Sequence, residues 1–133
     1  MSLPPEILMP YFEQSKEDLR QLEHLLLTME ANREVDEDER AEAMRLLHTL
    51  KGGGGMLGFF QVRDIAHGME SLVQNIQSME RDSRTKVLQV LLEARDELVH
   101  CLSSLEANGP EARRTTLSVL KRLKTEYSAL TQP

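Results

Sequence analysis

Apolar residues recur every three or four positions along nearly the whole chain, and this spacing limits its possible folds more than any other feature. Residues so spaced share one face of an α-helix, whereas a half-buried strand alternates every second residue. Alternating patterns are nearly absent from the sequence. The chain is therefore predicted to be all-α. The clearest helical stripe comprises Val62, Ile65, Ala66, Met69, Leu72, Val73, Ile76 and Met79.

Polar and helix-breaking segments divide this pattern into five predicted helices. The acidic stretch NREVDEDER separates the first two, and Asp36 or Asp38 is a candidate N-cap for the second. Asn108 and Gly109 are expected to end the fourth helix, and Pro110 suits the first turn of the fifth. The predicted helices cover about residues 5–29, 38–56, 62–80, 83–106 and 110–131.

The connections between these helices are short, which favours antiparallel neighbours. A length of 133 residues fits one domain, residues 1–133. We therefore expect an up-and-down four-helix bundle with an additional C-terminal fifth helix. The stripe of that fifth helix expected to face the bundle comprises Leu117, Leu120, Leu123, Tyr127 and Leu130.

Charge and composition exclude several classes of function. The formal net charge of −6 argues against nucleic acid as a partner, because phosphate binding requires a basic surface. Apolar runs extend over only a few residues, far too short for a membrane span. No basic segment followed by an apolar one marks a signal peptide at the N-terminus. Cys101 is the only cysteine, so a reducing, cytoplasmic setting is expected.

The segment HTLKGGGG, residues 48–55, carries the most unusual chemistry of the chain. At ~100° per residue, His48 lies roughly 140–150° from the centre of the apolar stripe of its helix, so it should face solvent. Lys51 and Gly52 are its neighbours on that surface, and Gly55 lies one turn further along. Glycines there leave the backbone bare beside the imidazole, at a cost of about 1 kcal/mol each relative to alanine.

Two ordinary explanations compete with a functional one. An exposed histidine on a helix is usually only a solvated side chain, and His24 and His100 are interpreted in that way. A run of glycines is more often a loop, in which case the second helix would end near Lys51. The combination of His48, Lys51, Gly52 and Gly55 favours a functional surface. Gly54 falls on the core side, where a small residue allows a neighbouring helix to come close.

His67 and Glu70 lie three residues apart on one flank of the third predicted helix. If the second and third helices pair antiparallel, Glu70 lies opposite His48. A carboxylate that accepts a hydrogen bond from one imidazole nitrogen fixes the tautomer and leaves the other nitrogen nucleophilic. The sequence leaves open whether Glu70 does this or is an ordinary solvated acid.

Other chemistries fit the same residues poorly. A nucleotide-binding loop needs its lysine after the glycines and a strand before them, and here neither holds. The spacing of His48, His67 and Glu70 matches no compact metal signature, so no metal is expected. Cys101 lies on the apolar stripe of its helix and is interpreted as a small core residue rather than a nucleophile.

The segment LLHTLKGGGGMLGF resembles the H-x-x-K-G signature of histidine phosphotransfer (HPt) domains. YFEQSKEDLRQLEHLLLTME is similar to the opening helix of that family, and AHGMESLVQNI resembles its third helix. The likeness covers about residues 11–105 and is weaker beyond them. Within the family it is nearest to the N-terminal phosphotransfer domain of the chemotaxis histidine kinase CheA.

The resemblance implies a phosphoryl carrier in two-component signalling. His48 would accept the γ-phosphoryl group of ATP-Mg held by a separate kinase domain and pass it to an aspartate of a CheY-type or CheB-type receiver domain. Lys51 would offset the phosphoryl charge, and Glu70 would hold the tautomer, with His67 nearby. The chain alone would bind no cofactor and would not be an enzyme.

Three settings for such a chain stay open at this point. Its end, TEYSALTQP, is typical of a linker, which favours a fragment of a larger histidine kinase. A free-standing shuttle of a multistep phosphorelay is the alternative within the same chemistry. A non-phosphorylated helical adaptor is a third, against which the presence of His48, Lys51 and Glu70 together argues.

Overall fold

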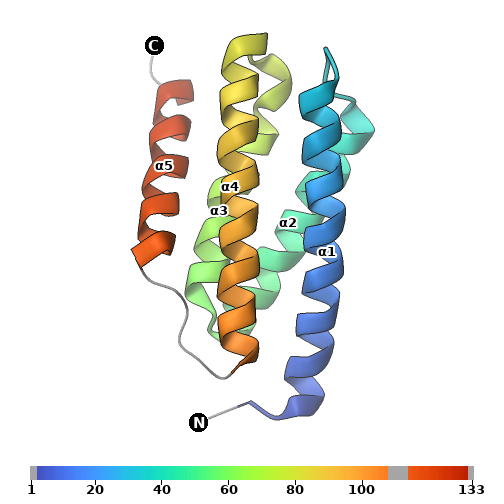
Figure 1. The fold of residues 1–133 in the computed structure, drawn as a ribbon, viewed down its shortest axis with the longest axis vertical. Helices are drawn as coiled ribbons and strands as arrows, with labels where there is room; N and C mark the ends of the chain where they lie inside the picture. The colour runs from blue at the N-terminus through green and yellow to red at the C-terminus, as the bar shows by residue number, and fades with distance from the viewer. Residues whose placement is uncertain (1–2, 108–113, 132–133) are drawn as a thin grey trace.

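A computed structural model describes residues 3–107 and 114–131, which form five α-helices and one short 3-10 helix without any strand. Helices α1 to α4 alternate in direction, and α5 lies against α3 and α4 on the outside of the bundle (Figure 1). The predicted all-α bundle with a fifth C-terminal helix is confirmed. The elements are α1 Pro5–Ala31, α2 Glu37–Leu57, α3 Phe60–Gln74, the 3-10 helix η1 Ile76–Ser78, α4 Arg81–Glu106 and α5 Arg114–Thr131.

Both ends of α2 are defined by local chemistry. Asp36, and not Asp38, is the N-cap: its side chain accepts hydrogen bonds from the backbone N–H groups of Asp38 and Glu39, at 2.7 and 3.1 Å. At the other end Gly58 adopts a left-handed φ of 79°, which glycine adopts without strain. The helix continues through all four glycines, so the prediction that it includes residues 52–55 holds and the loop alternative is wrong.

The third helix ends earlier than its apolar stripe predicts. The sequence indicates a helix to about residue 80, but α3 stops at Gln74 and η1 follows. The side-chain amide of Asn75 donates to the carbonyl of Ser71 at 2.9 Å, in place of the backbone N–H that would bond there in a continuing α-helix. The backbone N–H of Asn75 instead reaches the carbonyl of Leu72. Ile76 and Met79 remain buried, so the core keeps both side chains.

Helix α5 is rotated relative to the predicted stripe. Leu117 and Tyr127 were expected to face the bundle, but they are 65% and 40% exposed. The buried face consists of Thr116, Val119 and Leu123. In this orientation α5 contacts both α3 and α4. The expected start at Pro110 lies outside the described residues.

The core is otherwise built from the predicted apolar stripes. Leucine, isoleucine, valine and methionine side chains from α1 to α4 meet at its centre and are almost completely buried. Leu57, at the end of α2, is only half-buried. Within residues 3–107 and 114–131, no helix combines the length and apolar character needed to cross a membrane.

Candidate functional site

His48 and Glu70 meet across the surface between α2 and α3. The two helices are joined by only Gly58 and Phe59, so they pack side by side and antiparallel. Nδ1 of His48 lies 3.3 Å from Oε2 of Glu70, and the side chain of His48 is 73% exposed. The predicted exposure of His48 and its predicted position opposite Glu70 are both confirmed.

Lys51 contacts the same carboxylate. Its Nζ donates to Oε1 of Glu70 at 2.5 Å, while Oε2 faces the imidazole. The side chain of Glu70 is only 13% exposed and that of Lys51 26%, so this ion pair is partly shielded from water. A charge-assisted bond of this kind holds the carboxylate more firmly than a neutral one would. Lys51 therefore orients Glu70, a contact that the sequence analysis did not predict.

This arrangement selects one form of the imidazole. A carboxylate accepts hydrogen bonds only, so the neutral ring meets it with a proton on Nδ1. The lone pair of His48 then resides on Nε2, which belongs to the exposed part of the side chain. A nitrogen of this kind is a nucleophile open to a reactant from outside the protein.

His67 lies near the site without joining its hydrogen bonds. Its Nδ1 is 3.9 Å from Oε1 of Glu70, which is too long for a hydrogen bond. The side chain is 68% exposed on the same flank of α3. The structure thus brings His67 beside the cluster of His48, Lys51 and Glu70, where it adds a titratable group to the surface.

The first and last glycines of the run keep the surface beside His48 bare. A Cβ atom added at Gly52 would have no neighbour within 4 Å, so only solvent occupies that space. A Cβ at Gly55 would touch Cδ of Arg63 at an ordinary 3.5 Å. Neither position needs glycine for packing, so their lack of side chains leaves room for an approaching molecule.

The two middle glycines have packing reasons instead. A Cβ at Gly53 would lie 2.7 Å from Cε1 of Tyr11 on α1, a distance that real Cβ atoms essentially never show. A Cβ at Gly54 would lie 3.2 Å from the backbone of Phe59 and Arg63. Gly54 therefore permits the close approach of α3 that its place on the core side predicts. The contact of Gly53 with Tyr11 has no signal in the sequence.

The surface beyond the glycines includes residues that the sequence analysis missed. A shallow depression beside the site is lined by Lys51, Gly52, Gly55, Met56, Arg63, Asp64 and His67. Met56 is 89% exposed, the largest value among the exposed hydrophobic side chains described. Its position off the apolar stripe of α2 is the sequence signal that would have identified it.

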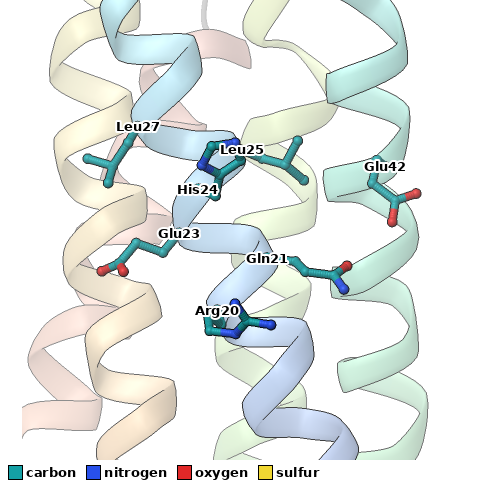
Figure 2. Close-up of a pocket in the computed structure, with 7 residues that line it drawn as sticks. All are labelled: Arg20, Gln21, Glu23, His24, Leu25, Leu27 and Glu42. Atoms are coloured by element: carbon teal, nitrogen blue, oxygen red, sulfur yellow. The ribbon is translucent and has the colours of Figure 1, made fainter.

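A second groove runs along α1, reaches Glu42 of α2 and offers no comparable chemistry (Figure 2). Its acids are already paired: Glu23 with Arg95 and Glu42 with Arg45. The hydrogen bond from Arg45 holds the pKa of the Glu42 carboxyl below its usual value. His24 on its rim is exposed and is not bonded to either acid among the described contacts. The groove is lined by Arg20, Gln21, Glu23, His24, Leu25, Leu27 and Glu42.

The described part of the chain shows neither a metal-binding cluster nor an exposed thiol. Residues 3–107 and 114–131 contain no group of three or more His, Cys, Asp or Glu side chains placed to hold a metal ion. Cys101 is buried on α4, with its Sγ 3.3 Å from Oγ1 of Thr116. The chemistry of the described surface is therefore concentrated at His48.

Several known proteins are similar to this chain over most of its length. Three relatives, each named chemotaxis protein CheA, come from Treponema pallidum, Halobacterium salinarum and Salmonella typhimurium. They are 29%, 27% and 25% identical over 93%, 80% and 92% of this chain. The chain spans less than a fifth of their lengths: 15%, 16% and 19%. The family described as "Hpt domain" matches residues 6–132. The chain therefore belongs to the Hpt domain family.

Proposed function

We propose that the chain carries a phosphoryl group on His48 within a two-component signalling system. The observation that carries this proposal is the hydrogen bond between Nδ1 of His48 and Glu70, which leaves Nε2 on an exposed surface. The Hpt family match and the similarity to CheA proteins support phosphotransfer as the chemistry. In the proposed sequence, a kinase domain with ATP-Mg supplies the group and an aspartate of a receiver domain takes it.

The first step is an in-line displacement at phosphorus. The lone pair of Nε2 attacks the γ-phosphorus of ATP, an N–P bond forms, the bond to the bridging oxygen breaks, and ADP leaves. The imidazole gains positive charge as the N–P bond forms. Glu70, 3.3 Å from Nδ1, is in place to stabilise that charge without any movement.

In the second step Nε2 of His48 is the leaving group instead of the nucleophile. A carboxylate oxygen of the receiver aspartate attacks the phosphorus, an O–P bond forms, and the N–P bond breaks. The electron pair of that bond returns to Nε2, and the ring regains the form it had before phosphorylation. Both steps require a large partner to bring a phosphorus atom in line with Nε2. The bare surface at Gly52 and Gly55 provides the room for that approach.

Lys51 and His67 are proposed to moderate charge at the site. A phosphoryl group adds about −1.5 to −2 charges to the surface. The ammonium of Lys51 neutralises Glu70, so the carboxylate repels the incoming group less. His67 is exposed on the same flank and contributes positive charge whenever it is protonated.

The chain is proposed to be the phosphotransfer part of a larger histidine kinase. The CheA relatives are several times longer than the region they share with this chain, and that remaining length can accommodate the ATP-binding domain. We propose that the present chain binds no cofactor and uses ATP-Mg only through its partner. A chemotaxis kinase with a CheY-type or CheB-type receiver is the favoured assignment. A free-standing phosphorelay shuttle is the second candidate.

The test is phosphorylation by a CheA-type kinase core that lacks its own phosphotransfer domain. Incubation with γ-labelled ATP and Mg²⁺ should label the wild-type chain, and the label should be acid-labile and base-stable, as expected for an N–P bond. His48→Gln should remain folded and unlabelled, because the side chain is exposed. His100→Gln is the matched control, since it changes another exposed histidine, and it should be labelled normally. Labelling of His48→Gln would overturn the proposal.

A further inference from the structure

Helix α5 comes very close to the backbone of α3 at Gly68. A Cβ atom added at this glycine would lie 3.2 Å from Cδ1 and 3.3 Å from Cβ of Leu123, both shorter than an ordinary contact of 3.4–4 Å. Leu123 is only 1% exposed. Glycine weakens the interior of a helix. Its presence at position 68 is explained by the close packing of Leu123.

This contact lies directly behind the site. Gly68 and Glu70 are two residues apart, so about 200° around the helix axis and about 3 Å along it separate them. They therefore face nearly opposite sides of the same turn of α3. Glu70 meets His48 on α2, whereas Gly68 meets Leu123 on α5. Figure 1 shows α3 between these two helices.

Near its start, α3 is held against α2 by another close contact. A Cβ added at Gly54 would lie 3.2 Å from the backbone nitrogen of Arg63. Glu70 follows Arg63 by seven residues, about 10 Å further along the axis, so this contact does not fix the distance of Glu70 from α2. At the level of Glu70, the packing of Leu123 is in place to do so.

The hydrogen bond of the site tolerates little movement of α3. Nδ1 of His48 lies 3.3 Å from Oε2 of Glu70, already at the upper end of the range for such bonds. A shift of α3 away from α2 by about 0.5 Å would lengthen it beyond that range. The proton on Nδ1 would then be held less strongly, and the tautomer with its proton on Nε2 would become more populated.

We infer that Leu123 is a positioning residue of the phosphotransfer site, a role that rests on the proposed function. By packing against the bare backbone at Gly68, it holds the turn that carries Glu70 within reach of His48. Helix α5 thus supports the reaction, although the side chains of His48, Lys51 and Glu70 all belong to α2 and α3.

Shortening Leu123 tests this role at the imidazole itself. At about pH 8.5, where an unperturbed imidazole is neutral, ring ¹⁵N chemical shifts report the tautomer of His48. Leu123→Ala should lower the ratio of the Nδ1–H to the Nε2–H form about twofold or more. Leu123→Val should lower it less, because it removes less of the side chain. Leu123→Met has nearly the same volume and should keep the wild-type ratio.

The same variants are then phosphorylated by a CheA-type kinase core with γ-labelled ATP and Mg²⁺. Leu123→Ala should lower kcat about three- to tenfold and leave the KM for the chain within about twofold, because the outer surface of α2 and α3 is unchanged. Thr116→Val is the matched control. It loosens α5 at its contact with α4, two turns earlier, and should keep the wild-type tautomer ratio and kcat. Each variant is measured below its own unfolding midpoint.

A wild-type tautomer ratio or a wild-type kcat in folded Leu123→Ala would overturn the inference. If Leu123→Ala does not fold, Leu123→Val decides in its place. An equal loss in Thr116→Val would also overturn the inference, because the effect would then reflect a general loosening of α5. Failure of the kinase core to label the wild-type chain would instead reject the proposed function, and the tautomer ratios would still decide whether Leu123 positions Glu70.

Discussion

Glu70 contacts two residues of α2 with its two carboxylate oxygens. Oε1 accepts from Lys51 at 2.5 Å and Oε2 lies 3.3 Å from the ring of His48. A carboxylate held at one end is preorganised at the other, so it need not reorient as the imidazole becomes positively charged. His48, Lys51 and Glu70 therefore form one unit that orients the imidazole of His48, the proposed nucleophile.

Glu70→Gln separates the charge of this unit from its shape. The amide oxygen can still accept from Nδ1, but it stabilises the charged ring less. We expect phosphorylation by the kinase core to be about 10 to 30 times slower, equivalent to about 1.4–2 kcal/mol in the barrier. Ring ¹⁵N chemical shifts should show a smaller fraction of the Nδ1–H tautomer. Glu42→Gln removes an exposed carboxylate elsewhere on α2 and serves as the control. Unchanged rate and shifts would remove Glu70 from the mechanism.

The pairing of Lys51 with Glu70 should be visible in stability as well. We expect a double-mutant cycle with Lys51→Met and Glu70→Gln to give a coupling energy of about 1 kcal/mol, because the pair is partly shielded from water. Urea unfolding of the four proteins measures it. An exposed pair such as Arg20 with Glu17 should give a smaller coupling. A coupling near zero for Lys51 and Glu70 would mean that solvent competes successfully for both charges.

At the scale of the element, α2 contains four consecutive glycines and still forms a continuous helix through them. Such residues weaken a helix, since glycine loses more backbone freedom on folding than any other residue. The helix persists because α1 and α3 pack against it. Gly53 and Gly54 allow these neighbours to come close, whereas Gly52 and Gly55 leave the outer surface open.

Neighbouring alanine substitutions should therefore have opposite effects. Gly52→Ala should raise the free energy of unfolding by about 0.5–1 kcal/mol, because its Cβ meets nothing within 4 Å. Gly53→Ala should lower it by about 1–3 kcal/mol, because its Cβ would overlap the ring of Tyr11. Chemical denaturation of the two variants tests both signs. Equal effects at the two positions would show that packing on α1 does not distinguish them.

A larger residue at the open position should separate stability from function. Gly52→Leu improves helix propensity and should not destabilise α2. Its side chain would occupy the space beside His48, so transfer to the receiver should slow by about tenfold or more. Single-turnover transfer kinetics measure this, with Gly52→Ala as the control for the small substituent. Wild-type transfer by Gly52→Leu would mean that the bare surface is not an approach path.

At the scale of the whole molecule, α5 is attached through a buried polar contact. Thr116 donates to the carboxylate of Glu97 on α4 at 2.6 Å, and both residues are buried. On the other side, Gly68 of α3 lies close enough to Leu123 that an added Cβ would meet it at 3.2 Å. The rotation of α5 follows from these two contacts, because a buried carboxylate without a hydrogen bond is costly.

Thr116→Val tests this attachment with little change in shape. The variant leaves Glu97 buried without its hydroxyl donor, so the free energy of unfolding should fall by about 1–3 kcal/mol. Thr125→Val, which changes an exposed threonine of the same helix, should cost less. Phosphorylation of His48 should be unchanged in both variants, since the site lies between α2 and α3. A stable Thr116→Val protein would show that apolar contacts alone hold α5.

The sequence by itself determined the helices, the exposure of His48 and the position of Glu70 opposite it. These follow from the 3.6-residue repeat and from a short connection that favours antiparallel packing, both of which are local properties of the chain. The tertiary structure decided which face α5 buries, because the carboxylate of Glu97 lies on another helix. It also decided the partner of Lys51 and the need for glycine beside Tyr11. Each of these depends on side chains that are distant in sequence and are brought within a few ångströms only by packing.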